Sequence, residues 1–204
     1  MKLTLDLVKA ATTTSPWDFG NGVLYRLCRE HPFHTDPAIV IAKVWLIGRS
    51  YAAAIERRRK VKIENPNFYI SKVGPAIINS DIDQWIRSVS SFTEINSDSI
   101  NNILYTHKNV TNLFNKISDM DKRSLASKYL HFHNPTMFFI YDSRAAYGIS
   151  KLSDILGRCR KNRDSFDNEY RKFAEKCLRL KEFIQSEFDI SLTPRQIDNL
   201  LLEI

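Results

Sequence analysis

Apolar residues recur at three- and four-residue intervals along most of this chain, and few residues interrupt that spacing. Only six glycines and seven prolines occur among the 204 residues, so helix-breaking positions are sparse. Segments that alternate apolar and polar residues, which would indicate β-strands, are scarce. The sequence therefore predicts an all-α fold with about eight to nine helices.

Short polar signals mark where several helices should begin. Asp36-Pro37 and Thr193-Pro194 each place a good N-cap residue before a proline in the first turn, which is the favoured order at a helix start. The apolar spacing after Asp36 predicts one long helix that reaches about Arg59. Residues 64–75 contain two proline-bearing turns and are interpreted as a surface loop.

The chain as a whole shows no sign of division. We find no repeat of fixed period and no long linker, so residues 1–204 should form one all-α domain, with room for an N-terminal helical subregion (1–75) packed on 76–204. Three widely spaced cysteines argue against a disulfide framework and a cysteine zinc site. No apolar run reaches the ~18 residues of a membrane span. We expect a cytoplasmic protein without a membrane partner, metal or cofactor.

The basic residues outnumber the acidic ones and concentrate in two places. The formal net charge is +7, which favours an anionic partner such as nucleic acid. The two clusters predict these phosphate contacts: Arg57, Arg58, Arg59, Lys60, Arg158, Arg160 and Lys161. In a second interpretation each cluster is a solvated helix end, because cations favour helix C-termini.

The most distinctive stretch runs from Ser124 to Arg144. A helix-compatible segment is followed by the Asn134-Pro135 break and an apolar run, and Asp142 then stands at a predicted helix start. Lys128 and Asp142 bracket this unit. A lysine on an apolar helix face has its pKa lowered by burial, which is what an amine nucleophile requires.

The segments ASKYLHFHNP and TMFFIYDSR within this stretch resemble the core of the helix-hairpin-helix DNA glycosylase superfamily, most nearly its small 8-oxoguanine-glycosylase-like members. The resemblance implies that Lys128 is a Schiff-base nucleophile and that Asp142 is its supporting carboxylate. Arg144 would contact a phosphate or pair with Asp142. The sequence departs from the family where Leu125-Ala126-Ser127 replaces the Gly-x-Gly of the hairpin.

Further residues are predicted to line a pocket around this pair. Tyr129, His131 and Tyr141 lie within the same stretch, and Arg49 and Glu56 are charged positions in the long helix predicted after Asp36. Charged residues on an apolar helix either face such a pocket or form a buried polar network. His131 and His133 are two residues apart and point to different helix faces, which does not suit a metal pair.

Two functions are compatible with the sequence. The first is a DNA-binding protein that excises a damaged base after the nucleotide is extruded, with Lys128 attacking the sugar. The second is a non-catalytic helical module that binds nucleic acid or a protein partner, in which Lys128 and Asp142 form a structural pair. The oligomeric state is left open.

Overall fold

The structure is a computed structural model that describes residues 3–57, 67–159 and 165–204. Its described part contains helices and no strand, which confirms the all-α prediction. In chain order the elements are α1 (Leu5–Thr12), α2 (Asp18–Glu30), α3 (Pro37–Ser50), the π-helix η1 (Tyr69–Val73), α4 (Gly74–Ile78), α5 (Ile82–Arg87), α6 (Ile100–Ser118), α7 (Arg123–His133), α8 (Ser143–Lys151), α9 (Ser153–Leu156), α10 (Asn168–Phe188) and α11 (Pro194–Glu203).

The predicted number of eight to nine helices is too low for the described residues, which form eleven α-helices. The difference comes from short elements. Helices α4, α5 and α9 have 5, 6 and 4 residues, too few for an apolar period to repeat. The surface loop predicted at 64–75 is wrong for residues 69–75, which form η1 and the start of α4.

The predicted helix starts are confirmed at three positions. Asp36 accepts hydrogen bonds from Ala38 N and Ile39 N at the start of α3. Thr193 and Gln196 form a reciprocal capping box at the start of α11. Asp142 is the N-cap of α8, so the carboxylate of the distinctive stretch also begins a helix.

The prediction of a long helix from Asp36 to Arg59 is wrong, because α3 ends at Ser50. Ala52 adopts a left-handed conformation with φ 50°, and the N–H of Ala53 donates to the carbonyl of Gly48 over 2.8 Å. This is a Schellman termination with alanine in the position that glycine usually occupies. The chain then turns back so closely that a Cβ on Gly48 would lie 3.0 Å from the Cα of Ala54.

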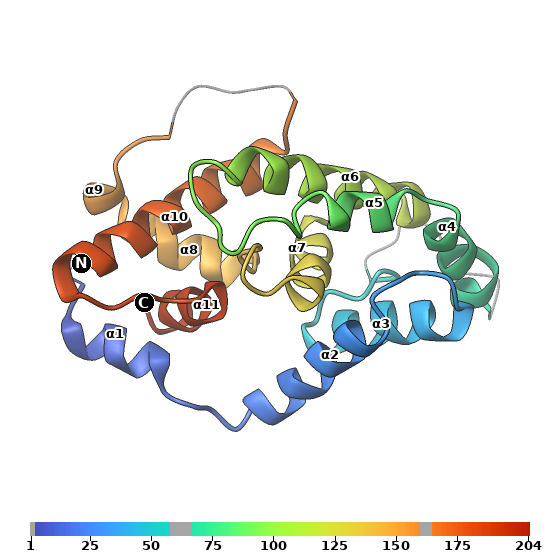
Figure 1. The fold of residues 1–204 in the computed structure, drawn as a ribbon, viewed down its shortest axis with the longest axis horizontal. Helices are drawn as coiled ribbons and strands as arrows, with labels where there is room; N and C mark the ends of the chain where they lie inside the picture. The colour runs from blue at the N-terminus through green and yellow to red at the C-terminus, as the bar shows by residue number, and fades with distance from the viewer. Residues whose placement is uncertain (1–2, 58–66, 160–164) are drawn as a thin grey trace.

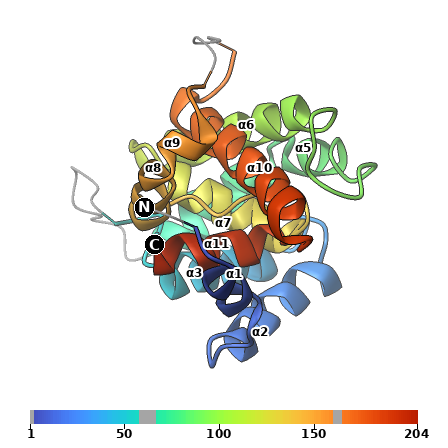
Figure 2. The same ribbon diagram turned by 90° about the vertical axis from the view of Figure 1, so that its left-hand side faces the viewer.

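Helix α7 lies at the centre of the molecule and packs against α2, α3 and α6. Figure 1 shows α10 running above α8, and α11 lying below α8. Figure 2 shows the same helices from the side. Helix α1 packs on α11, which brings the two chain ends to the same side of the molecule (Figure 1). Each of the first three helices therefore contacts a later part of the chain, and α2 and α3 also contact each other.

The connector between α7 and α8 crosses the core in an extended form. Met137 to Ile140 are all at most 1% exposed, and side chains satisfy several of the connector's backbone groups. His131 Nδ1 bonds the carbonyl of Phe138 over 2.8 Å, and the Tyr170 hydroxyl donates to the carbonyl of Phe139 over 3.1 Å. The connector thereby fixes where Asp142 stands.

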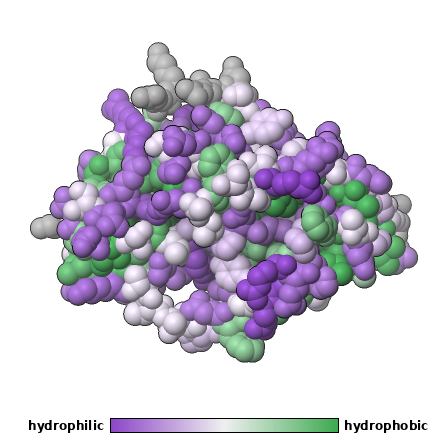
Figure 3. Space-filling model, in the orientation of Figure 1, coloured by the Kyte–Doolittle hydropathy of each residue, from purple (hydrophilic) through white to green (hydrophobic). Residues whose placement is uncertain are grey.

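Hydrophilic side chains cover most of the face seen in Figure 3, and apolar groups are scattered between them. The described residues nevertheless include two neighbouring aromatic side chains that are almost fully exposed, Trp17 at 78% and Phe19 at 80%. They lie at the start of α2.

Candidate functional site

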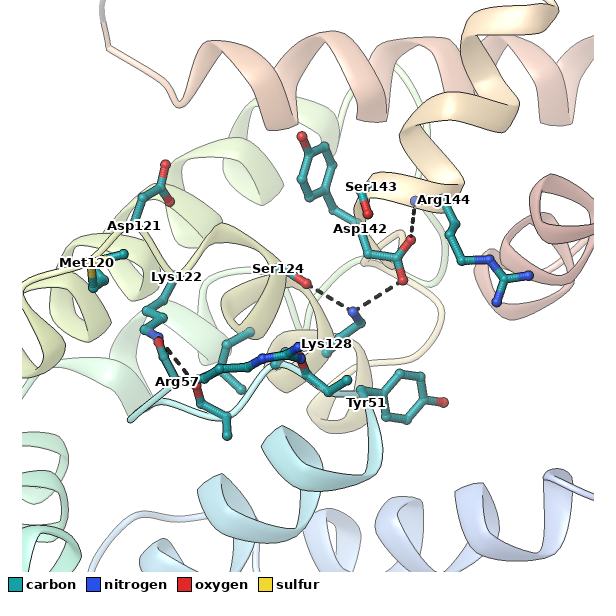
Figure 4. A pocket seen from close by; sticks show the side chains of 15 residues that line it. Tyr51, Arg57, Met120, Asp121, Lys122, Ser124, Lys128, Asp142, Ser143 and Arg144 are labelled. Carbon is teal, nitrogen blue, oxygen red and sulfur yellow. Dashed lines mark hydrogen bonds and ion pairs between the residues drawn. The ribbon is translucent and has the colours of Figure 1, made fainter. Parts of the chain in front are cut away.

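A cavity of about 480 Å³ opens between the turn after α3, the start of α7 and the start of α8. This volume lies within the range of small-ligand sites. Lys128 and Asp142 are both in its wall, together with Ser124, Tyr51 and Arg144. The structure thus places the two residues that the sequence singled out in one concave site (Figure 4).

The Lys128 amine lies between two oxygen acceptors. Its Nζ donates to Ser124 Oγ over 2.9 Å and to Asp142 Oδ2 over 3.3 Å, and Figure 4 shows these acceptors on either side of it. The ring of Tyr51 lies 5.7 Å away, at cation–π distance. Among the described residues no third hydrogen-bond partner of Nζ is found.

Asp142 is held by both its neighbours and its own helix. Its Oδ1 accepts from Arg144 N over 3.0 Å and from Ala145 N over 2.9 Å, while its Oδ2 faces Lys128. The positive end of the α8 dipole adds to the stabilisation of the carboxylate. The carboxylate orientation is therefore fixed whether or not the amine carries a charge.

Burial and pairing act against each other on the pKa values of this pair. Burial lowers the pKa of Lys128, and the neighbouring Asp142 raises it by a smaller amount, so the pKa remains below its ordinary value. Burial raises the pKa of Asp142, but the charge of Lys128 and the hydrogen bonds from the start of α8 together leave it lowered. The site thus combines an amine that gives up its proton more readily with a carboxylate that stays ionised.

The cavity carries an excess of positive charge. Four basic side chains line it, from Arg57, Lys122, Lys128 and Arg144, against two acidic ones, from Asp121 and Asp142. Such an arrangement attracts an anionic ligand, and arginine and lysine side chains both bind phosphate.

Arg57 and Arg144 lie at this cavity as the predicted phosphate contacts would require. The guanidinium of Arg57 donates to the carbonyl of Ala52 over 2.6 Å. Arg144 is exposed, and Figure 4 shows its guanidinium directed away from Lys128 toward α11. It does not pair with Asp142 through its side chain. Its backbone N–H makes that contact instead.

Arg49 and Glu56 form an ion pair beside the cavity rather than in its wall. The guanidinium of Arg49 bonds Glu56, and the Tyr69 hydroxyl donates to the second oxygen of that carboxylate over 2.5 Å. Arg49 is 57% exposed in its side chain. Arg49 and Glu56 line a neighbouring hollow together with Arg57. Their ion pair joins the two sides of the turn after α3 and stabilises that turn.

Tyr129 and His131 do not line the Lys128 cavity, because both side chains point into the core. The Tyr129 hydroxyl bonds His34 Nε2 over 2.7 Å, and His131 Nε2 bonds the Tyr25 hydroxyl over 2.7 Å. Both residues are completely buried. Tyr141, the third aromatic or imidazole residue predicted there, does line the cavity.

Five predicted phosphate contacts fall outside the described residues: Arg58, Arg59, Lys60, Arg160 and Lys161. Arg158 is described and exposed, and it lines a second cavity that also includes Tyr141.

Two residues in the cavity wall were missed by sequence reasoning. Ser124 precedes Lys128 by one helical turn, so its presence on the same face is a signal that the sequence contains. Lys122 is buried and donates to the carbonyls of Ala54 and Arg57 over 3.3 and 2.7 Å. No local pattern indicates that contact, because it joins segments more than 60 residues apart.

The described residues contain no group of three or more His, Cys, Asp or Glu side chains arranged to hold a metal ion. Among the helices of the described ranges, none combines the length and apolar character needed to cross a membrane. Comparison of the chain with family models, with curated proteins and with solved structures finds no match.

Proposed function

We propose that this protein binds DNA and acts on a damaged or abasic nucleotide through the amine of Lys128. The observation that carries the proposal is the contact of 3.3 Å between Lys128 Nζ and the capping carboxylate of Asp142, inside a cavity with excess positive charge. The resemblance to helix-hairpin-helix glycosylases implies the same two residues in the same roles.

In the proposed reaction the neutral Lys128 amine attacks C1′ of an extruded nucleotide. The new C–N bond forms as the glycosidic bond breaks, and the base departs with the electron pair of that bond. The attacking nitrogen then loses a proton, and opening of the sugar ring gives an imine between Lys128 and C1′. With an abasic site the amine condenses directly with the C1′ aldehyde, and water leaves. Asp142 stabilises the positive charge that develops at C1′.

The position of the amine fits this role. A reactive lysine must be neutral at working pH, and burial moves the pKa of Lys128 in that direction. Lys43 is also buried and its pKa is also lowered, but within the described ranges the one hydrogen-bond acceptor of its Nζ is the carbonyl of Phe33, at 3.5 Å. Lys128 combines a lowered pKa with a carboxylate partner and a place in the cavity wall.

DNA contact in this proposal depends on side chains rather than on a hairpin. Leu125, Ala126 and Ser127 occupy the positions of the family's hairpin glycines, and all three are buried within α7. Their backbone therefore does not meet a phosphate. Arg57 and Arg144, at the rim of the cavity, are the phosphate contacts instead.

The burial of these three positions favours the second candidate function, a non-catalytic binding module. In that case the Lys128–Asp142 pair only joins α7 to the start of α8. Such a module would bind nucleic acid or a protein partner, and only the first function forms a covalent adduct with DNA.

Borohydride trapping distinguishes the two functions. Labelled oligonucleotides that carry an abasic site, 8-oxoguanine or uracil are incubated with the protein and reduced, and peptide mapping by mass spectrometry locates any adduct. We expect the adduct on Lys128 and its loss in Lys128→Met, with Lys43→Met as the matched control because Lys43 is another buried lysine. Binding without any adduct would leave the non-catalytic module.

A further inference from the structure

A second cavity lies directly beside the first and shares one wall residue with it. It has a volume of about 530 Å³ and extends along α8 toward α9 and α10. Tyr141 lines both cavities. Tyr141 therefore lies where the two cavities meet.

Several contacts hold Tyr141 in place. The backbone N–H of Tyr141 donates to Ser127 Oγ over 3.0 Å, and the same hydroxyl lies 3.3 Å from the carbonyl of Tyr141. The ring meets Phe173 edge-on, with centroids 5.1 Å apart, and the guanidinium of Arg123 lies 5.7 Å from its centroid. Arg123 is fixed in turn by both carboxylate oxygens of Asp167. Tyr141 thus presents an ordered aromatic surface.

The chemistry of the second cavity combines aromatic and aliphatic walls with basic side chains. Phe173 and Ile149 lie in its wall beside Tyr141, and Arg158, Lys172 and Lys176 supply positive charge against Asp154 and Glu169. Lys172 pairs with Glu169 over 3.2 Å. Arg158 is exposed, and its guanidinium makes no hydrogen bond or ion pair within the described part of the chain.

Each cavity is lined by one described arginine from a basic cluster of the sequence. Arg57, from the first cluster, lines the first cavity, and Arg158, from the second, lines the other. A nucleic-acid strand that passes from one cavity to the other beside Tyr141 would meet cations in both cavities. Aromatic rings flanked by cations bind single strands, because each base has a face that stacks and each nucleotide carries a phosphate.

We infer that the second cavity binds the nucleotide adjacent to the one at Lys128, so that the substrate is a strand in which at least two neighbouring nucleotides are unpaired. This inference rests on the proposed function for the identity of the first nucleotide. It adds the substrate class: an exposed single strand or a locally unpaired duplex, rather than an intact duplex with one extruded base. Arg158, Lys172 and Lys176 hold the phosphate of the second nucleotide.

The test measures binding apart from chemistry. Oligonucleotides carry a tetrahydrofuran abasic analogue, which has no aldehyde and forms no imine, in four contexts: a single strand, a full duplex, a duplex whose 5′ neighbour of the analogue is unpaired, and a duplex whose 3′ neighbour is unpaired. Fluorescence anisotropy gives the Kd as a function of salt. We expect the single strand and one of the two unpaired-neighbour duplexes to bind at least about 10-fold more tightly than the full duplex.

The triple variant Arg158→Ala, Lys172→Ala, Lys176→Ala should lose this preference, and its salt slope for single strands should fall by about 0.7 for each phosphate contact removed. The matched control removes three exposed cations elsewhere, by Lys9→Ala, Arg87→Ala and Lys116→Ala, and should keep the preference. Equal affinity of the native protein for all contexts, or a triple variant that keeps the preference, would overturn the inference. Neither binding result changes the outcome of borohydride trapping at Lys128. If trapping fails, the binding measurements still test whether the protein prefers unpaired neighbouring nucleotides.

Discussion

The Nζ atom of Lys128 lies 3.3 Å from the Oδ2 atom of Asp142, although the two residues are 14 positions apart in the chain. The contact is asymmetric. Asp142 retains two backbone N–H donors if the amine is removed, whereas Lys128 without Asp142 is a buried cation whose remaining hydrogen-bond partner is the hydroxyl of Ser124.

This asymmetry predicts unequal effects on stability. Lys128→Met should change the free energy of unfolding by less than about 1 kcal/mol, because an apolar side chain of similar length avoids the cost of burying a charge. Asp142→Ala should lower the free energy of unfolding by about 2–4 kcal/mol, since it removes the N-cap of α8 and leaves the buried lysine without its carboxylate partner. Urea denaturation of both variants measures the difference. Equal losses would show that the pair is mainly structural.

Gly148 on α8 is predicted to be intolerant of any side chain. A Cβ at this position would lie 2.2 Å from the carbonyl oxygen of Leu201 in α11, so Gly148→Ala must push the two helices apart and should cost at least about 3 kcal/mol. The matched control is Gly22→Ala in α2, where a Cβ would meet nothing within 4 Å. It should stabilise the protein by up to about 1 kcal/mol. Thermal denaturation that shifts both variants in the same direction would contradict this prediction.

A glycine at position 52 is predicted to stabilise the protein. The φ of 50° at Ala52 strains an alanine but not a glycine, so Ala52→Gly should raise the free energy of unfolding by about 1 kcal/mol. Ala53→Gly, one residue later, lacks that strain and should lower it. Urea denaturation compares the two variants, and a loss of stability in Ala52→Gly would mean that the turn is unstrained.

Acid should destabilise the protein through its buried histidines. Burial lowers the pKa of His107 to about 3 and that of His131 to about 4, so below their ordinary pKa of about 6.5 the unfolded chain binds protons that the folded chain does not. Their contribution is complete above about pH 6.5. It should fall by about 4 kcal/mol for the two residues between pH 7 and 5.

Asp198 works against this loss over the same interval. Burial raises its pKa to about 7, so the folded chain takes up a proton as the pH falls below 7, before the unfolded chain does. Asp198 should therefore offset about 2 kcal/mol of the histidine loss by pH 5. Urea denaturation from pH 7 to 5 should show a steeper loss of stability for Asp198→Asn than for the native protein. An unchanged slope in that variant would exclude Asp198 as the compensating group.

Arg144 should contribute to nucleic-acid affinity without being needed for folding. Arg144→Ala removes an exposed cation at the cavity and should reduce the salt slope for single-stranded DNA by about 0.7, with stability unchanged within about 0.5 kcal/mol. Arg49→Ala is the control, because that guanidinium is engaged by Glu56 outside the Lys128 cavity. Equal slopes for the two variants would remove Arg144 from the binding surface.

The parts of the fold that could be predicted are those with a local chemical signal. Asp36, Asp142 and Thr193 cap helices because their side chains accept N–H groups two or three residues away, a relationship contained in a few neighbouring residues. The end of α3 could not be predicted, because its left-handed residue is Ala52 rather than a glycine. The contact that allows this turn, between Gly48 and Ala54, becomes visible only after the chain has folded back.

The candidate site, too, could be predicted only in part. Lys128 and Asp142 were chosen because their residue types suit amine chemistry, and the structure places them in contact. Tyr129 and His131 were assigned to the pocket only because they are close in sequence to Lys128. Which side of α7 meets the cavity and which meets α2 depends on tertiary packing, so nearness in sequence was a poor guide to nearness in space.

The buried connector from Met137 to Tyr141 has one further consequence. Its carbonyls at Phe138 and Phe139 bond His131 and Tyr170, and its last residue bonds Ser127. These backbone groups of the connector are thus bonded by side chains rather than by the backbone of a neighbouring strand. A sheet tolerates almost any residue on the neighbouring strand, because the ladder uses backbone groups alone. Here the bonding depends on three particular side chains, so replacing one of them with an apolar residue leaves a peptide group of the connector without that partner.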